Sequence, residues 1–365
     1  MSRKQCFLGD VIKFGNGKAR PNSDGNYPIY GGNGILGYTG ETNYNGETII
    51  IGRVGAYCGS VYYENKPIWV SDNALAAKPK DFNDTKYLYY FLLNLQLNHF
   101  AEGSSHPLVT HTLLNSIDIE ISDDENEQKA IAGVLSSLDD KIDLLHRQNK
   151  TLEAMAETLF RQWFENEENN STISQLITIQ NGYAFKSKDF INDGIHQIIK
   201  IRNISNGIVD IVNPDYVSND VIKDLQCNFK IESGDILIAM TGADIGKLGI
   251  VPNTNRFLWL NQRVGMLKEK FPNSKYMAYL QLKSEFGQDH INSTATGSAQ
   301  PNISGTGIEE CGFPNVSEKE ITACSNQIGY FYKKIIVNLG QIRTLEKLRE
   351  TLLPKLMSGE VRVKY

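Results

Sequence analysis

The sequence repeats itself, and this repeat limits the possible folds more than any other feature does. The segment "TLEAMAETL" at residues 151–159 returns as "TLEKLRETL" at residues 344–352, with Thr, Leu and Glu at the same relative positions. Three further pairs of similar segments recur in the same order. They are "GETIIIGRVG" (46–55) and "GDILIAMTG" (234–242), "TKYLYYFLL" (85–93) and "SKYMAYLQL" (274–282), and "GSSHPLVT" (103–110) and "GSAQPNIS" (297–304). Duplicated halves predict two similar domains built from the same elements.

Composition is typical of a globular protein of two or three domains. Of the 365 residues, 41% are hydrophobic, which is enough to form buried cores. No apolar run is long enough to cross a membrane, and residues 1–13 lack the apolar centre of a signal peptide, so we expect a cytoplasmic protein without membrane contact. The five cysteines are scattered, odd in number and without a C-x-x-C pair. Neither a disulfide framework nor a zinc site is predicted.

Each half closes with a long helical segment. "SDDE" (122–125) and "SEKE" (317–320) fit the S-x-x-E capping box, in which Ser accepts from a first-turn amide and Glu reaches back. Beyond each box, apolar residues recur at alternating steps of three and four, a pattern typical of a coiled-coil seam. The predicted seam residues are Leu138, Ile142, Leu145, Asn149, Leu152, Ala156, Leu159 and Trp163 in the first helix, and Phe331, Ile335, Asn338, Ile342, Leu345 and Leu352 in the second. The second helix is expected to bend or end near Pro354, with Gly359 as a stop.

The two helices are expected to pair with each other. A first helix of roughly 40 residues would be about 60 Å long, which is more than one small domain covers. Residues 123–170 carry 12 acidic and 5 basic side chains, and residues 318–365 carry 5 acidic and 9 basic ones, so opposite charge favours pairing. Because the first helix leads into the second domain, paired seams would run antiparallel, with the domains at opposite ends. If only one seam were present, a helix packed on its own domain would be as good an interpretation. The duplication of the seam favours pairing of the two helices with each other.

The expected fold class is therefore α+β: two similar mixed α/β globular domains joined by two long antiparallel coiled-coil helices, with a pseudo-twofold internal repeat. The predicted boundaries place the first domain at residues 1–122, the first helix at 123–168, the second domain at 169–316 and the second helix at 317–365.

Motifs that could carry catalysis are weak in this sequence. "GGNGILG" (31–37) contains G-x-G-x-x-G, but a polar, turn-rich stretch follows where a dinucleotide site needs a helix. "GNGKAR" (15–20) lacks the flanking residues of a P-loop. "NPDY" (213–216) resembles the Asn-Pro-Pro-Tyr tetrapeptide of adenine methyltransferases, but Asp215 replaces the second Pro and a turn is the favoured interpretation. The histidines show no metal spacing. We therefore expect no catalytic residue, no metal and no cofactor on this chain.

Taken together, the repeat and several characteristic segments resemble the specificity subunit of type I restriction–modification systems over nearly the whole chain. The segments are "YPIYGGNGILGY" (27–38), "NGYAFKSKDF" (181–190), "IKIRNISNG" (199–207), "GSAQPNIS", "EQKAIAGVLSSLDDKIDLLHRQN" (127–149) and "LLPKLMSGEVRV" (352–363). "VSEKEITACSNQ" (316–327) follows the family's helix opening less closely.

The resemblance implies two target-recognition domains, each reading one half of a split, asymmetric site in double-stranded DNA, with the helices as a ruler between them. It also implies two adenine methyltransferase subunits that bring S-adenosylmethionine. ATP-dependent endonuclease and translocase subunits would bring ATP and Mg. The chain itself would be a noncatalytic DNA-binding subunit of a cytoplasmic restriction system.

Candidate DNA contacts follow from side-chain chemistry and from position in the repeat. Arg, Lys, Asn and Gln recognise base edges, and other basic and hydroxyl groups contact phosphates. In the first domain the candidates are Lys13, Lys18, Arg20, Arg53, Ser104, Ser105 and His106. In the second they are Lys186, Lys188, Arg202, Asn203, Thr241, Lys247, Arg263, Ser298, Gln300 and Asn302. Arg53 is favoured because Gly52 and Gly55 allow close approach to a groove, whereas Lys18 and Arg20 could equally be solvated cations.

Two other functions stay open from the sequence. The net charge of −5 argues by itself against DNA, so the chain could be a two-lobed coiled-coil module that binds another protein. It could also be a degenerate methyltransferase, as "NPDY" hints. An adjoining methyltransferase gene would favour DNA recognition over the interaction module, and S-adenosylmethionine binding by the isolated chain would favour the enzyme. The bases read are not encoded in the sequence alone, because they depend on loop geometry and DNA shape.

Overall fold

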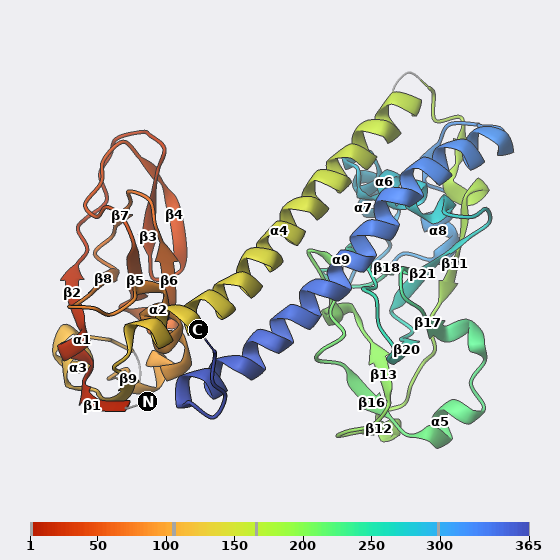
Figure 1. Ribbon diagram of the computed structural model, residues 1–365. Coiled ribbons are helices and arrows are strands. Elements are labelled where there is room, and N and C mark those ends of the chain that lie inside the picture. The colour runs from red at the N-terminus through yellow and green to blue at the C-terminus, as the bar shows by residue number, and fades with distance from the viewer. Residues whose placement is uncertain (1–2, 104–106, 165–166, 298–299, 365) are drawn as a thin grey trace. The chain divides into compact units, whose positions relative to one another are not determined.

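Two globular bodies and two long helices make up the computed structural model, which describes residues 3–103, 107–164, 167–297 and 300–364 (Figure 1). The chain divides into unit 1, residues 1–142 with 345–365, and unit 2, residues 143–344. Helices α4 (Glu125–Phe164) and α9 (Glu318–Ser358) each contribute one segment to each unit. Within the described ranges no helix is both long and apolar enough to span a membrane.

Unit 1 is built on a four-stranded antiparallel sheet in the order β2-β8-β5-β6 and a three-stranded sheet in the order β4-β3-β7. Helix α2 packs on the larger sheet, and β1 pairs with β9 (Figure 1). The elements are β1 (Arg3–Phe7), α1 (Leu8–Val11), β2 (Ile12–Asn16), β3 (Tyr27–Gly31), β4 (Gly34–Thr39), β5 (Thr48–Gly52), β6 (Val61–Glu64), β7 (Trp69–Val70), β8 (Ala74–Pro79), α2 (Thr85–Leu95), α3 (His111–Ser116) and β9 (Asp118–Ser122).

Local sequence explains the centre of unit 1. The β-branched run of β5 is buried on both faces, because one face meets α2 and the other meets the smaller sheet. Asp84 begins α2 by accepting the backbone N–H of Tyr87 at 2.8 Å, and Tyr87 is fully buried. The tyrosine hydroxyl of Tyr90 on the same helix donates to Asp139 at 2.6 Å, which attaches α2 to the first part of α4.

Unit 2 carries a six-stranded sheet in the order β11-β21-β18-β19-β15-β14 and a five-stranded sheet in the order β12-β16-β13-β20-β17. Its strands are β10 (Ser171–Thr172), β11 (Ile177–Asn181), β12 (Phe190–Ile191), β13 (His196–Ile199), β14 (Ile204–Ser205), β15 (Gly207–Val209), β16 (Asp215–Val217), β17 (Lys230–Ile231), β18 (Ile236–Ala239), β19 (Leu248–Ile250), β20 (Phe257–Leu260), β21 (Val264–Glu269) and β22 (Gly312–Phe313). Its shorter helices are α5 (Asn219–Lys223), α6 (Ser274–Lys283), α7 (Glu285–Thr294) and α8 (Gly305–Glu309).

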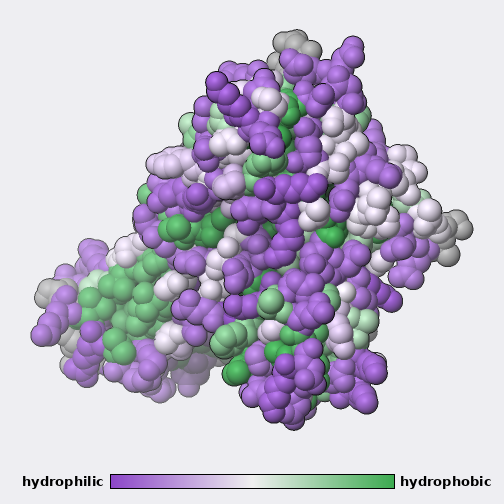
Figure 2. All heavy atoms as spheres, turned by 90° about the vertical axis from the view of Figure 1, so that its right-hand side faces the viewer, coloured by the Kyte–Doolittle hydropathy of each residue, from purple (hydrophilic) through white to green (hydrophobic). Residues whose placement is uncertain are grey.

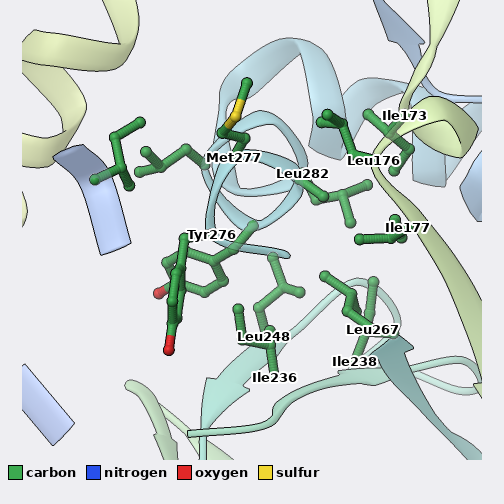
Figure 3. Packing of buried hydrophobic residues seen from close by; sticks show 14 of the residues in the cluster. Ile173, Leu176, Ile177, Ile236, Ile238, Leu248, Leu267, Tyr276, Met277 and Leu282 are labelled. Carbon is green, nitrogen blue, oxygen red and sulfur yellow. The ribbon is translucent and has the colours of Figure 1, made fainter. Parts of the chain in front are cut away.

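The core of unit 2 lies between α6 and the six-stranded sheet, as Figure 3 shows. Ile236 and Ile238 of β18 point from the sheet toward Met277 and Leu282 of α6, and Tyr276 lies beside them. The ring of Tyr276 also stacks on Tyr332 of α9, with centroids 4.7 Å apart. A buried aromatic pair therefore holds the α9 segment of unit 2 onto its globular body.

Within each unit the segments of α4 and α9 run antiparallel. In unit 2 the side-chain amides of Asn149 and Asn338 hydrogen-bond at 2.8 Å, whereas Leu159, further along α4, lies with Phe331, which precedes Asn338 on α9. In unit 1 Asp139 accepts from Arg349 at 2.7 Å, whereas α4 residues before Asp139 pack with α9 residues after Arg349. The predicted α+β class and the pairing of two long helices are thus confirmed.

Burial along the predicted seam is graded. Ile142, Leu145, Ala156, Ile335, Asn338 and Ile342 are buried, and Leu138, Asn149, Leu152, Leu159, Trp163, Phe331, Leu345 and Leu352 are half-buried. Half-buried side chains beside fully buried ones are expected in a two-helix pair, because two helices alone cannot enclose every side chain of their common face.

The helix ends differ in part from the predictions. The capping box predicted at residues 122–125 is wrong. Ser122 ends β9 and its hydroxyl donates to Glu127, whereas the side chain of Asp124 accepts the backbone N–H of Asn126 at 2.8 Å. The second box is present: the hydroxyl and the backbone N–H of Ser317 donate to Glu320 at 2.7 and 2.8 Å, and these two contacts lower the pKa of Glu320. Helix α9 does not end at Pro354 but runs on to Ser358, and Gly359 follows with a φ of 76°.

Candidate nucleic-acid interface

Both units contain the same backbone junction, in which the loop after a buried strand meets a later loop. In unit 1 the N–H of Gly55 donates to the carbonyl of Pro107 at 3.2 Å, and the N–H of Val109 donates to that of Arg53 at 2.9 Å. In unit 2 Gly242 donates to Pro301 at 2.8 Å, and Ile303 donates to Met240 at 3.0 Å. The shared pairing makes Met240 the structural counterpart of Arg53, and Thr241 the counterpart of Val54.

Arg53 is well placed for an external ligand. Its backbone is fixed by the bonds of the junction, and its half-buried side chain has an Nε atom without a partner among the described residues. A Cβ at Gly52 would lie 2.3 Å from the carbonyl oxygen of Tyr57, so close packing requires glycine there, whereas Gly55 is favoured by its left-handed backbone, with a φ of 76°. The predicted neighbours Ser104, Ser105 and His106 lie outside the described residues.

Several predicted residues of unit 2 surround the matching junction. Asn302 bridges both Thr241 and Thr296 through the backbone, and Gln300 and Asn302 are exposed. The hydroxyl of Thr241 is buried without a partner among the described residues. Lys247 is exposed and forms an ion pair with Asp244. Ser298 lies outside the described residues.

The remaining predicted cations of unit 1 are exposed but are not gathered at the junction by any contact. Lys18 is held through its backbone, whose N–H donates to Val70 at 3.0 Å and whose carbonyl accepts from the indole of Trp69 at 3.2 Å. Lys13 lies in β2 opposite Lys78, and Arg20 is exposed in the loop that follows. None of the three cationic groups has an ion-pair partner among the described residues, so they suit phosphates better than a fixed base edge.

A pocket in unit 2 collects cations and aromatic rings. It is lined by Phe185, Ser187, Phe190, Lys200, Ile201, Arg202, Asn261, Gln262 and Arg263. Lys200 and Arg202 both bind the carboxylate of Asp215, at 2.7 and 2.8 Å, and the Lys200 ammonium lies 4.0 Å from the centroid of the Phe190 ring. Burial would raise the pKa of Asp215, but the two cations outweigh it and the pKa is lowered.

This geometry gives the "NPDY" segment a structural role, because Asp215 begins β16 and anchors two cations. It also changes one predicted contact. Asn203 is buried, accepts the backbone N–H of Lys200 at 3.0 Å and donates to the carbonyl of Asn213 at 3.2 Å. The side-chain amide of Asn203 is therefore hydrogen-bonded within the local turn and is not exposed for a contact with a base. Lys186 and Lys188 are exposed, as their predicted role at phosphates requires.

The sequence comparison of the halves missed one pair of turns. "SDN" (71–73) and "NQR" (261–263) each lie just before a buried strand, and only Arg263 was predicted as a contact. The available signal was that two polar residues precede an apolar strand at the same place in each half. Figure 2 shows that hydrophilic residues predominate on the displayed face, with smaller hydrophobic areas between them.

The described residues do not form a recognisable catalytic site. They contain no group of His, Cys, Asp and Glu that could hold a metal ion. Burial raises the pKa of Cys311 and Cys324 to about 12, so these thiols stay protonated and unreactive at neutral pH. What the units do present is exposed cations, amides and hydroxyls on fixed loops, which is the chemistry of recognition.

Comparisons with known proteins agree with this assignment. The family model for the type I restriction modification DNA specificity domain matches residues 4–154 and again residues 166–338. The MjaVIII specificity subunit of a type I restriction enzyme from Methanocaldococcus jannaschii is 25% identical, with 98% of this chain and 92% of that protein covered. The MjaIX specificity subunit from the same organism is 24% identical over 84% of this chain and 76% of that protein.

A solved structure shows the same fold. The S subunit of a type I restriction–modification system from M. genitalium superposes with a TM-score of 0.70 at 18% identity, and 98% of this chain and 96% of that chain are covered. Because the family model describes a DNA specificity domain and covers most of the chain, the methyltransferase interpretation and that of an interaction module without DNA specificity are set aside. The chain belongs to the type I restriction modification DNA specificity domain family, as a noncatalytic subunit that supplies DNA sequence specificity.

Proposed function

We propose that residues 1–122 and 169–316 are two target-recognition domains, each reading one half of a split, asymmetric DNA site. The helices, at residues 123–168 and 317–365, would set the gap between the halves. The observation that carries this proposal is the duplicated junction, in which the same backbone bonds hold different residues. These are the half-buried Arg53 and the exposed Val54 in one unit, and the buried Met240 and the half-buried Thr241 in the other. Equal scaffolds with unequal side chains suit two unequal half-sites.

Partners supply the chemistry under this proposal. Two adenine methyltransferase subunits would bind S-adenosylmethionine, and endonuclease and translocase subunits would bind ATP and Mg, in the cytoplasm where the DNA lies. Base flipping for methylation would also belong to the methyltransferases. The net charge of −5 is compatible with this division, because the chain needs only local cations at its own contacts.

The contacts divide by chemistry into two groups. Lys13, Lys18, Arg20, Lys186, Lys188 and Lys247 are exposed cations that we assign to phosphates. Arg53, Arg202, Arg263, Thr241, Gln300 and Asn302 lie at the junctions or the pocket, where we assign base or sugar contacts. Ser104, Ser105, His106 and Ser298 lie outside the described residues and stay candidate contacts by their position in the sequence alone.

The test is to co-express the full chain with an adenine methyltransferase subunit from the same genome and to map methylated adenines in the DNA. A split motif with a constant gap is expected. Absence of methylation, or an unsplit motif, overturns the proposal. Arg53→Ala should relax base preference in one half-site only, by roughly tenfold. Lys129→Ala is the matched control, because Lys129 is an exposed cation of unit 1 that pairs with Glu125 on α4.

A further inference from the structure

We propose that the two-residue turns at Asp72–Asn73 and Gln262–Arg263 read bases, one turn in each half-site. This inference rests on the proposed function, because it names the residues that make the two recognition domains differ. The turns immediately precede β8 in unit 1 and β21 in unit 2.

Backbone hydrogen bonds show that the turns are structural counterparts. Ala74 donates to Ser71 at 3.0 Å in unit 1, and Val264 donates to Asn261 at 2.9 Å in unit 2. Each turn is also tied to its junction in the same way. The N–H of Arg53 donates to the carbonyl of Asn73 at 3.0 Å, and the N–H of its counterpart Met240 donates to that of Arg263 at 3.0 Å.

Each turn has a rigid base. Ser71 and Asn261, the residues that begin the turns, are buried, and each forms a parallel bridge, to Lys18 and to Tyr183 respectively. The glycine before each bridge partner, Gly17 before Lys18 and Gly182 before Tyr183, lets the two backbones come close together. A Cβ at Gly17 would lie 1.7 Å from the carbonyl oxygen of Ser71, and one at Gly182 would lie 2.1 Å from that of Asn261. A turn held this closely can position a side chain to the accuracy that base recognition needs.

The side chains of the turns are free. Asp72, Asn73, Gln262 and Arg263 are all exposed. Within the described part of the chain, none of the four forms a side-chain hydrogen bond or an ion pair, in contrast to Arg202, which is bound to Asp215. Polar groups that are rigidly presented and have no internal partner are available to an external donor or acceptor.

The chemistry of the two turns differs, and this difference predicts different bases. In the major groove an Asp carboxylate accepts from the N4 amino group of cytosine, and an Asn amide pairs with adenine. A Gln amide also pairs with adenine, whereas the Arg guanidinium suits the O6 and N7 atoms of guanine. Unit 1 is therefore expected to select cytosine or adenine at its turn, and unit 2 adenine or guanine.

Surroundings in unit 2 agree with this role. Gln262 and Arg263 line the pocket that also contains Lys200 and Arg202, whose charges are balanced only partly by Asp215. Beside a base-reading turn, Lys200 can hold a neighbouring phosphate and Arg202 a neighbouring base or sugar, which fixes the register of the bases against Gln262 and Arg263.

The experiment compares variants of the full chain in complex with its methyltransferase subunits, using selection from a randomised duplex DNA library and methylation mapping as readouts. Arg263→Ala should lose about tenfold or more of the preference at one base pair of the second half-site and leave the first half-site unchanged. The paired exchange Asp72→Gln with Asn73→Arg should change the first half-site only, toward adenine and guanine. Arg147→Ala, which removes an exposed arginine paired with Asp143 on α4, is the control and should change neither half-site.

The outcomes separate this inference from the proposed function. A wild-type complex that selects no split motif overturns both. If the wild-type complex selects a split motif but both variants keep unchanged base preferences, base reading by the two turns is overturned and the proposed function is not. A uniform loss of affinity for all sequences also overturns base reading, because it is the signature of a phosphate contact. The exposed positions and unchanged circular dichroism spectra guard against a folding defect, and the two variants lie in different units.

Discussion

The side chains of Asn149 and Asn338 meet inside the helix pair of unit 2, with Nδ2 of Asn338 donating to Oδ1 of Asn149 at 2.8 Å. Asn338 is fully buried, and the remaining amide atoms, Nδ2 of Asn149 and Oδ1 of Asn338, have no further partner within the described residues. An antiparallel pair with one buried amide pair has a defined register, because any slip would leave both amides unpaired in an apolar seam.

Removing one of these amides should cost more stability than removing both. Asn338→Leu leaves the amide of Asn149 unpaired, and we expect a loss of about 1–3 kcal/mol in the free energy of unfolding. The double variant Asn149→Leu with Asn338→Leu should recover most of this loss, because no polar group is then buried without a partner. Urea denaturation followed by circular dichroism measures both, and a double variant no more stable than Asn338→Leu would contradict the interpretation.

Gly182 should not tolerate a methyl group. Gly182→Ala forces the backbone of the turn at Asn261 to move, and a destabilisation of about 1–3 kcal/mol is expected from such overpacking. Gly133 is the matched control, because it lies exposed in α4 and a Cβ added there would meet nothing within 4 Å. Gly133→Ala should stabilise the protein by about 1 kcal/mol through helix propensity. Equal effects of the two substitutions on the thermal midpoint would argue against the close contact.

The contribution of Asp215 to stability should depend on pH. Its pKa is lowered from the ordinary value of 3.8 in the folded protein, so the stabilisation is complete above that value and disappears as the pH falls through the lowered one. The difference in unfolding free energy between wild type and Asp215→Asn should therefore be constant from pH 7 to pH 5 and shrink below about pH 4. Asp220→Asn, in an exposed pair with Lys223, should show a smaller difference throughout. A wild-type advantage that grows on acidification would reverse the assigned sign.

Lengthening both helices should lengthen the gap between half-sites. Seven residues inserted after residue 142 of α4, with seven matching residues inserted before residue 345 of α9, preserve the heptad seam and add about 10.5 Å. At 3.4 Å per base pair this corresponds to about three base pairs. Methylation mapping should find the two half-sites unchanged and the gap longer. Altered half-sites with a constant gap would exclude a ruler role for the helices, and insertions of seven residues in an exposed loop serve as the control.

Local patterns explain why much of the fold was predictable. The heptad steps of residues 138–163 and 331–352 lie within single helices, so their spacing alone places them on one face. The capping box at Ser317 was also correct, because all its partners lie within one turn. The repeat predicted two similar domains, because similar segments in the same order form similar strands and helices.

Long-range contacts decided the rest. Ser122 looked like a helix cap in sequence, but its pairing in β9 with Arg3 left the cap to Asp124. Asn203 looked like a free amide until the fold buried it against Asn213.

The sequence by itself thus determined the duplicated architecture, the two long helices and the family. Only the tertiary structure decided that Arg53 matches Met240 and that Asp72–Asn73 and Gln262–Arg263 occupy equivalent turns. The physical reason is that periodicity and capping are set by residues within a few positions of each other. The exposure and partners of a polar side chain are set instead by strands and loops that are distant in the sequence and meet only when the chain is folded.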